Sequence, residues 1–384
     1  MLKVLAKEES IVELAARYGV SRKTIYKWIR RYEKQGLGGL IDQSRRPRNS
    51  PMRTSAEAVL EMIQLRKEHP TWGPKKIVAV LARRHPERQL PAVVTVGRVL
   101  REARLMKRYN RRSSGGLSPA TPSYIPSAAN DLWTVDFKGW WQNRDGARCE
   151  PLTMGEAVSR YVLRIQLMIR TRGEDVRPVF EDLFERYGLP KAIQSDNGSP
   201  FASARAPGGL TALSAWWISL GIIVVRSRPA HPQDNGGHER MHRDMRFELE
   251  DRAAATLMDQ QRACDAWATV FNQERPHEAL EQRTPAEIYR VSPRRPSALV
   301  IGDYPDGCRL AKVSGTGNIS YQGCKVYVSA GLRGYMVGLQ AMGSGSEVRV
   351  WFCQVLLGAF VLGADATLEP VDNTPNGEGL KASL

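Results

Sequence analysis

The sequence predicts a multidomain protein with all-α helix-turn-helix units at the N-terminus, an α/β core on a mixed sheet, and a small β-barrel at the C-terminus. Three patterns carry this prediction. They are helical spacing of apolar residues before residue 110, alternating strands and helices from residue 131, and short strand-like runs with Gly-rich turns after residue 297. A chain of 384 residues also suits several modest domains better than one core.

The expected domains follow these changes of pattern. They are a helix-turn-helix domain (1–49), a second helical domain (50–111), a linker (112–129), the α/β core (130–296), the β-barrel domain (297–364) and a disordered tail (365–384). The linker and the tail are assigned by composition, because segments rich in Ser, Pro, Gly or other polar residues bury little apolar surface.

Residues 10–36 have the pattern of a helix-turn-helix. Ser10 and Glu13 have the spacing of a capping box, Gly19 supplies the positive φ of a tight turn, and Ser21 caps a second helix. This layout is typical of a recognition helix in the major groove, followed by a basic linker that crosses phosphates. The candidate DNA-contact residues are Arg22, Lys23, Lys27, Arg30 and Arg31 on the helix, and Arg45, Arg46 and Arg48 on the linker.

Residues 54–108 are expected to form a second helical unit, in which one helix opens at Trp72-Gly73-Pro74. We interpret it as a second DNA-binding helix-turn-helix. Its basic residues from Arg101 to Arg112 are compatible with DNA contact and equally with a solvated face. The formal net charge of +16 favours a polyanionic partner, and nucleic acid is the first candidate.

From residue 131 the expected elements are a strand (132–137), two strands with a turn (151–168), a helix (174–187), a strand (191–194), a helix (210–220), a strand (222–226) and a long helix from about Gly236. Three strands followed by alternating helices and strands indicate a mixed sheet covered on both faces. After residue 297, five or six short strand-like runs indicate the small β-barrel.

The cysteine spacing and the apolar stretches exclude several classes of protein. The five cysteines are scattered and form no Cys-x-x-Cys pair, so we expect reduced thiols rather than a disulfide framework or a zinc ribbon. No apolar stretch reaches the ~20 residues of a membrane-spanning helix, and the N-terminus lacks the apolar region of a signal peptide. We therefore expect a cytoplasmic protein with no membrane partner.

Three acidic residues stand where phosphodiester chemistry with metal ions needs them. Asp136 ends the first core strand, Asp196 follows the fourth, and Glu239 lies in the first turn of the long helix. If the two strands are adjacent and parallel, both aspartates project at one sheet edge, where the helix can add Glu239. Carboxylates suit Mg²⁺, and two such ions about 3.5–4 Å apart hold the attacking and leaving oxygens in line. Taken singly, each acid would be an ordinary cap or turn residue.

Several local motifs occur in a fixed order along the chain, and together they indicate a protein family. They are W-G-P-K-K-I from Trp72, W-T-V-D-F-K from Trp133, P-L-T from Pro151 with S-R-Y from Ser159, D-N-G from Asp196, H-P-Q-D-N-G from His231 with Glu239 and Arg240, and Asn272 with R-P-H-E-A-L from Arg275. With them the chain resembles the bacterial insertion-sequence transposases of the retroviral-integrase-like superfamily, known for a D,D,E triad. The resemblance covers nearly the whole chain.

The resemblance implies a ribonuclease-H-like core in which Asp136, Asp196 and Glu239 are catalytic and bind two Mg²⁺ ions, with Mn²⁺ as an alternative metal. It implies a transposase or integrase that binds double-stranded DNA at transposon ends, cleaves it by hydrolysis, and joins the freed 3′-OH to target DNA. A homo-oligomer on paired ends, associated with the bacterial nucleoid, belongs to the same expectation. Arg240 and Arg243 follow Glu239 on its helix and are expected to reach phosphates.

The chain departs from the family pattern near the third acid. The segment between Asp196 and Glu239 is longer than is usual, which indicates a loop insertion around residues 202–209. Gly237-His238 replaces a bulkier pair, and a glycine there weakens a helix by about 1 kcal/mol. Glu156 stands where many relatives carry Asp. The residues Asn197, Asn235 and His231 could orient ligands, contact DNA, or make only turn hydrogen bonds.

Two other functions fit parts of the sequence. A domesticated DNA-binding regulator would keep the fold without the chemistry, and the intact triad of acids speaks against it. A simple metal-dependent nuclease would not need the N-terminal DNA-binding half.

Overall fold

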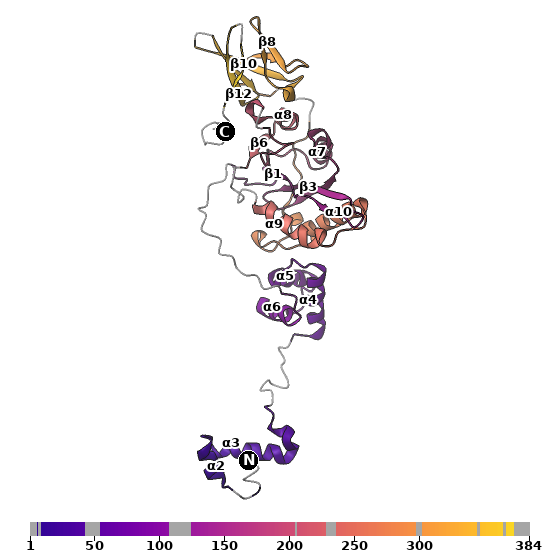
Figure 1. Ribbon diagram of the computed structural model, residues 1–384, viewed down its shortest axis with the longest axis vertical. Helices are drawn as coiled ribbons and strands as arrows, with labels where there is room; N and C mark the ends of the chain where they lie inside the picture. Colours follow the sequence, from indigo (N-terminus) through magenta and orange to yellow (C-terminus); the bar gives the residue numbers. More distant parts are fainter. Residues whose placement is uncertain are drawn as a thin grey trace. The chain divides into compact units, whose positions relative to one another are not determined.

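We describe a computed structural model of the chain for residues 6, 9–42, 54–106, 124–203, 206–227, 236–296, 302–343, 346–363 and 366–371. It divides into two compact units, residues 1–55 and 56–384, which we treat separately (Figure 1). Several predicted residues lie outside the described ranges, namely Arg45, Arg46, Arg48, His231 and Asn235. In the described ranges, no helix has both the length and the apolar character needed to cross a membrane.

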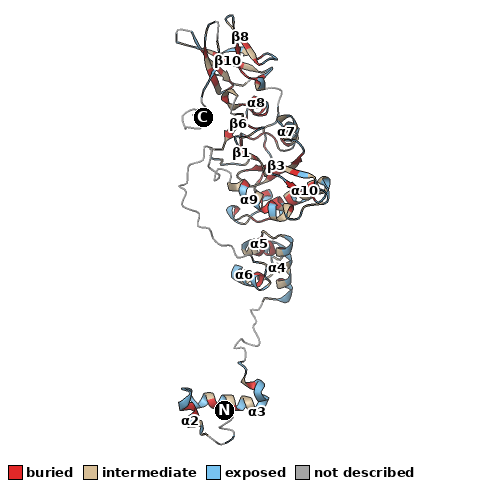
Figure 2. Ribbon diagram, in the orientation of Figure 1, coloured by how far each residue is buried: buried red, intermediate tan, exposed pale blue. Residues whose placement is uncertain are grey.

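The N-terminal unit contains the expected pair of helices, α2 (Ile11–Arg17) and α3 (Arg22–Gln35). The capping box is confirmed, since the Glu13 N–H donates to Ser10 Oγ at 3.2 Å and the Ser10 N–H donates to the Glu13 carboxylate at 3.0 Å. Ser21 caps α3 as expected, and Gly19 has a φ of 62°. The small core contains Leu14, Ala15, Ile25 and Ile29. In Figure 2, buried residues are red and exposed ones pale blue, and both occur on α2 and α3.

The second unit begins with three helices, α4 (Ala56–Glu68), α5 (Pro74–Arg84) and α6 (Val93–Glu102). Pro74 occupies the first turn of α5, where its missing N–H costs nothing. The helices bury a compact apolar cluster that includes Met62, Trp72, Ile77 and Leu100. This confirms the second helical region.

A six-stranded mixed sheet forms the centre of the second unit. Its strands are β1 (Leu132–Phe137), β2 (Trp141–Gln142), β3 (Arg148–Glu156), β4 (Val162–Met168), β5 (Ala192–Ser195) and β6 (Ile223–Arg226). The order is β2-β3-β1-β5-β6, with β4 paired to β3. Strands β1, β5 and β6 run parallel, whereas β3 is antiparallel to β1 and β4. The predicted mixed sheet is confirmed, and β2 is a short addition that the pattern did not indicate.

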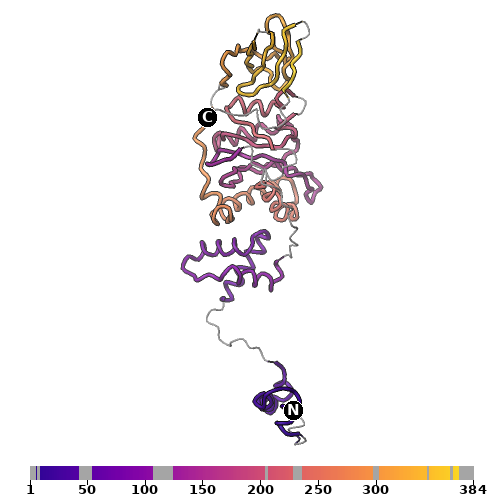
Figure 3. The backbone as a smooth tube through the Cα atoms, turned by 90° about the vertical axis from the view of Figure 1, so that its left-hand side faces the viewer, coloured from indigo at the N-terminus to yellow at the C-terminus, as the bar shows by residue number. Residues whose placement is uncertain are grey.

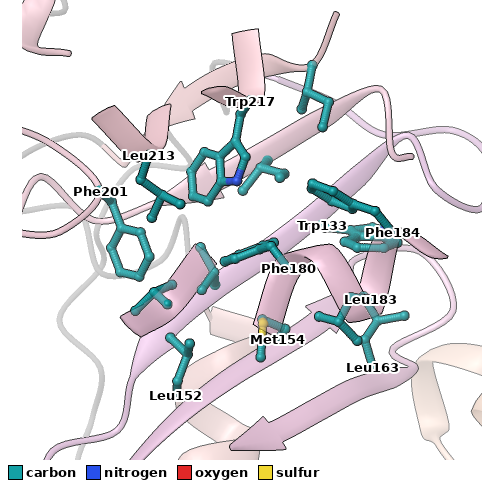
Figure 4. Packing of buried hydrophobic residues seen from close by; sticks show 14 of the residues in the cluster. Trp133, Leu152, Met154, Leu163, Phe180, Leu183, Phe184, Phe201, Leu213 and Trp217 are labelled. Atoms are coloured by element: carbon teal, nitrogen blue, oxygen red, sulfur yellow. The ribbon is translucent and has the colours of Figure 1, made fainter. Parts of the chain in front are cut away.

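Helices cover both faces of this sheet. On one face, α7 (Gly173–Tyr187) and α8 (Ala212–Ser219) bury a cluster in which Phe180, Phe184 and Trp217 meet Trp133 of β1 (Figure 4). On the other face lie α9 (Gly236–Met245), a π-helical turn (Arg246–Glu250) and α10 (Leu257–Gln273). Since side chains alternate along a strand, the burial of Trp133 and Val135 under α7 and α8 turns Asp136 toward the α9 face.

The C-terminal region, coloured orange to yellow in Figure 3, forms an open antiparallel sheet with a separate β8-β9 hairpin. The strand order in the sheet is β13-β12-β11-β10-β7. The bounds are β7 (Arg309–Lys312), β8 (Asn318–Tyr321), β9 (Cys324–Tyr327), β10 (Met336–Met342), β11 (Glu347–Phe352), β12 (Val355–Val361) and β13 (Glu369–Pro370). In the part of the chain that the structure describes, no ladder joins the two edges, so the predicted barrel is not confirmed. Strand β13 lies within the segment that we expected to be disordered.

In the expected insertion around residues 202–209, the structure describes residues 202–203 and 206–209, which contain no α-helix or β-strand. A short 3-10 turn (Pro207–Gly209) holds two glycines with positive φ. Arg226 of β6 donates to the carbonyls of Gly208 and Gly209 at 2.9 and 2.7 Å. Gly208 also lies against Leu357 of β12, so the insertion joins the core to the C-terminal sheet.

Candidate active site

The two predicted aspartates lie at the same edge of the sheet because β1 and β5 are adjacent and parallel. The ladder pairs Leu132 with Ala192 and Thr134 with Gln194, an offset of 60 residues. Asp136 and Asp196 each lie two residues beyond the last of these pairs and have the same offset. The condition on which the sequence argument depended is therefore met.

Glu239 approaches these aspartates from the first turn of α9. Its charge and that of Asp196 both raise the pKa of Asp136, although burial of Asp136 has the larger effect, and the Phe137 N–H opposes them. Together they raise the pKa of Asp136 to about 7. The three carboxyl groups thus interact electrostatically. Asp136 is half-buried, whereas Asp196 and Glu239 are exposed.

A threonine hydroxyl joins α9 to the sheet beside Asp136. Thr153 of β3 pairs with Asp136 across the ladder, and its Oγ1 lies 2.9 Å from the Asp136 carbonyl oxygen. The Thr153 Oγ1 also lies 3.0 Å from Nε2 of His238 and 2.8 Å from Nε2 of His242. The histidines flank Glu239 on α9, so the strand that carries Asp136 and the helix that carries Glu239 share one hydrogen-bonded centre, which we call the Thr153 centre.

The Thr153 centre has one consistent set of protons. A hydroxyl donates once and accepts twice, and only donation to the Asp136 carbonyl explains their short contact. Both histidines must then donate from Nε2. Burial, with further cations near His242, lowers the pKa of His238 to about 4 and that of His242 to about 3, so both rings are neutral near pH 7.

The two departures in the glutamate motif have structural reasons. His238 is buried on Thr153, as described above. Gly237 leaves room for Arg160, because a Cβ at this position would overlap Nη1 of that side chain. The start of α9 is therefore held by contacts to the β3–β4 turn, despite the intrinsic cost of its glycines.

The carboxylates have the right chemistry for a hard divalent cation. In the described residues, no ion pair includes Asp136, Asp196 or Glu239, so no side-chain cation already offsets their mutual repulsion. This repulsion adds to the larger effect of burial in raising the pKa of Asp136, and a bound cation would relieve it. However, no set of three His, Cys, Asp or Glu side chains in the described ranges is close enough to hold a metal ion.

Other residues singled out in the sequence have structural contacts. Asn197 donates to the Ser227 carbonyl at 3.0 Å, which supports the turn interpretation. Glu156 is buried and accepts hydrogen bonds from the N–H groups of Asn130, Val158 and Ser159. It therefore organises the β3–β4 turn.

The predicted DNA-contact residues that the structure describes lie at the surface. Arg22, Lys23, Lys27 and Arg30 are exposed on α3, and Arg31 is half-buried. The four exposed cations, but not Arg31, border a surface groove on α2 and α3 that Ile11, Ser21 and Tyr26 also line. On α9, Arg240 and Arg243 are exposed.

Sequence reasoning did not single out Thr153 or find a role for Asn272. Asn272 of α10 forms two hydrogen bonds of 2.8 Å with the backbone N–H and C=O of Val162, so it pairs with the edge of β4. A threonine in a strand and an asparagine in a helix give no pattern that indicates such partners. Only the alternation of β1 and β3 could have indicated that Thr153 faces α9.

Different protein families match the N-terminal helical regions and the central sheet region of the chain. Integrase core domain families match residues 126–232 and 220–285. Homeodomain-like domain families match residues 1–41 and 24–100. The first pair of matches covers the sheet, its helices and all three predicted acids. The second covers both helical regions.

Similar proteins were found among curated sequences and solved structures. The chain is 24% identical over 241 residues to the insertion element IS407 uncharacterized 31.7 kDa protein of Burkholderia multivorans, covering 62% of this chain and 83% of that protein. The integrase catalytic core domain of HTLV-2 in complex with magnesium is 16% identical with a TM-score of 0.33, over 42% of this chain and 98% of that one. A simian T-cell lymphotropic virus intasome in complex with the PP2A regulatory subunit B56 gamma is 13% identical with a TM-score of 0.37, over 77% and 97%. The integrase core domains, the homeodomain-like domains and the insertion-element relative together support an insertion-sequence transposase of the integrase-like superfamily.

Proposed function

We propose that this transposase cleaves transposon-end DNA and joins the freed 3′-OH to target DNA at a two-metal site formed by Asp136, Asp196 and Glu239. One observation carries the proposal. The two aspartates lie at the same offset on adjacent parallel strands, within electrostatic reach of each other and of Glu239. Mg²⁺ is the expected ion, with Mn²⁺ as an alternative.

The three carboxylates have distinct parts in this proposal. Asp136 is the most buried and interacts with both other acids, so it would be the central ligand of the site. Asp196 and Glu239 would supply the other carboxylate oxygens that hold the ions. When bound, the ions would activate a water and then the DNA 3′-OH, and would offset the charge that develops on the phosphate.

The remaining residues bind and orient DNA. The basic face of α3 would contact the transposon end, and Arg240 and Arg243 would contact phosphates near the carboxylates. The Thr153 centre would hold α9 so that Glu239 faces Asp136. Since transposition joins two ends to one target, the proposal includes a homo-oligomer on paired ends.

Replacement of Glu239 by Gln tests the proposed chemistry. Purified wild-type protein should cleave a duplex of the inverted repeats that flank its gene in the presence of Mg²⁺ and should be inactive with EDTA. Glu239→Gln should bind the duplex with wild-type affinity but lose at least about 100-fold in cleavage rate, because a neutral amide is a poor ligand for Mg²⁺.

The matched control is Glu185→Gln, which neutralises an exposed acid on α7 and should cleave as the wild type does. Equal cleavage by Glu239→Gln and the wild type would exclude the proposed metal site. A wild type that binds these ends but never cuts them would instead favour a DNA-binding regulator.

A further inference from the structure

Two arginine side chains meet at the start of α9. Arg160 lies on the β3–β4 turn with a φ of 63°, and its guanidinium rests against Gly237. Arg240 is in the first turns of α9, and its Nε donates to the Gly236 carbonyl at 3.0 Å. The charge of Arg240 and burial both lower the pKa of Arg160, so the two guanidinium groups are close enough to repel each other.

Neither guanidinium forms an ion pair with a carboxylate in the described part of the chain. Glu156 attracts Arg160, but its oxygens already accept hydrogen bonds from the β3–β4 turn. Two cations held together without a bridging anion raise the free energy of the native state, unless a bound anion compensates them.

His277 provides a third, independent observation. Its Nε2 is buried and has no hydrogen-bond partner in the described structure, and its ring packs edge-on against Phe271 at 4.8 Å. The charges of Arg160 and Arg240 both act on this ring. A buried ring nitrogen without a partner is unfavourable, and an oxygen of a bound ligand would satisfy it.

Two other cations act on His277 and have carboxylates near them. Arg275 forms a buried ion pair with Asp244. Lys76 of α5 is attracted by Asp244, Glu248 and Glu278, although burial and the charge of Arg275 lower its pKa to about 8. Arg160 and Arg240 differ from Arg275 in that neither has an ion pair in the described residues, and both lie at the start of α9.

We propose that Arg160, Arg240 and His277 form a binding site for one phosphate of the DNA backbone, next to the carboxylates of the proposed metal site. The planar guanidinium presents a pair of N–H donors that match two phosphate oxygens, and two such groups satisfy a phosphodiester from different directions. Gly237 is part of the site, because a Cβ at this position would require the guanidinium end of Arg160 to shift. The assignment rests on the proposed function, since the phosphate belongs to the DNA that is cut.

A test couples the arginine to a single phosphate. The full chain binds a duplex of the flanking inverted repeat in Ca²⁺, without cleavage, while neutral methylphosphonates replace one phosphate at a time near the terminus. The wild type should lose about 10-fold in affinity or more at one position, as expected for a charge-assisted hydrogen bond. Arg160→Gln should bind the unmodified duplex more weakly than the wild type does, by the same factor. The methylphosphonate at that position should then cause no further loss of affinity in this variant.

Two variants control the result. Arg186→Gln removes an exposed arginine of α7 that pairs with Asp182, and it should keep the wild-type pattern. Gly237→Ala keeps both arginines but displaces Arg160, and it should lose affinity at the same phosphate. A thermal melt of each variant separates misfolding from a specific decrease in DNA affinity.

Independent, additive losses from the variant and the methylphosphonate at every position would overturn the site. Binding to a random-sequence duplex gives a second reading, in which Arg160→Gln should lower the slope of log affinity against log salt by about 0.9. An unchanged slope in a folded Arg160→Gln protein would also overturn the proposed phosphate site. This result does not depend on whether the protein recognises the inverted repeats. Cleavage is not measured, so failure here is separate from failure of the Glu239→Gln test.

Discussion

At the scale of single residues, the carboxyl group of Asp136 carries most of the argument for the proposed metal site. Burial and the charges of Asp196 and Glu239 make its carboxylate unfavourable in the native state, and its pKa rises to about 7. The unfolded chain has no such neighbours, and there the pKa is near its ordinary 3.8. The native state therefore holds the proton more tightly than the unfolded state.

This difference predicts that Asp136→Asn stabilises the metal-free protein at pH 8. An acid with a raised native pKa loses stability as pH rises from about 4 to about 7, and the amide removes this loss. The Tm of the variant should therefore exceed that of the wild type at pH 8 and approach it near pH 4. Mg²⁺ should raise the Tm of the wild type but not that of Asp136→Asn.

The measurement is calorimetry with EDTA and then with Mg²⁺. Asp251→Asn, which neutralises an exposed acid outside the site, should shift the Tm little at either pH. If Asp136→Asn melts at or below the wild-type temperature at pH 8, the charge repulsion inferred at the sheet edge is absent.

At the scale of elements, α9 carries the one acid of the proposed site that lies on a helix, and the Thr153 centre connects this helix to the sheet. Strands β1 and β5 hold the two aspartates through the ladder itself. Glu239 has no such support, since its helix touches the sheet through side chains. His238 and His242 lie on either side of Glu239 along α9, so their hydrogen bonds to Thr153 fix both the position and the rotation of the helix.

Thr153→Val should therefore reduce cleavage without weakening DNA binding. Valine has the same shape but leaves two buried Nε2–H groups without an acceptor, at a cost of about 1–3 kcal/mol each. We expect kcat to fall about 10-fold or more while the Kd for DNA is unchanged. Thr153→Ser keeps the hydroxyl and should restore most of the rate.

Nitrogen NMR of the histidine rings gives a second reading. Both rings should be neutral with the proton on Nε2 in the wild type and in Thr153→Ser, and should lose this signature in Thr153→Val. Wild-type kcat in a folded Thr153→Val protein would show that α9 is positioned by other contacts.

The order of the elements could be predicted from the sequence because it depends on local patterns. The capping boxes, the stripe of α7 and the apolar strands β1 and β5 are readable over a few residues each. The contacts that complete the site could not be predicted this way. Thr153 and His238 are 85 residues apart, and Arg160 reaches Gly237 across a similar separation. The open C-terminal sheet differs from the expected barrel for the same reason, since closure depends on pairing between distant edges.

At the scale of the whole molecule, recognition and chemistry belong to parts with separate cores. The N-terminal unit has its own cluster around Leu14 and Ile29, and its basic groove lies on α2 and α3. The three carboxylates lie in the second unit, where other apolar clusters support the sheet. Charge removed from α3 should therefore change how tightly DNA binds and leave the reacting groups as they are.

The double variant Lys27→Gln/Arg30→Gln tests this separation. Each side chain is an exposed cation beside the groove of α3, and removal of each cation that binds a phosphate should lower the slope of log affinity against log salt by about 0.9. At saturating DNA, the cleavage rate should equal that of the wild type. Arg17→Gln is the matched control, since Arg17 is an exposed cation of α2 that already pairs with Glu9 at 2.9 Å. If the two units work independently, charge on the N-terminal unit affects only the affinity for DNA. A lower cleavage rate at saturating DNA with an unchanged Kd would therefore mean that the N-terminal unit acts on the chemical step.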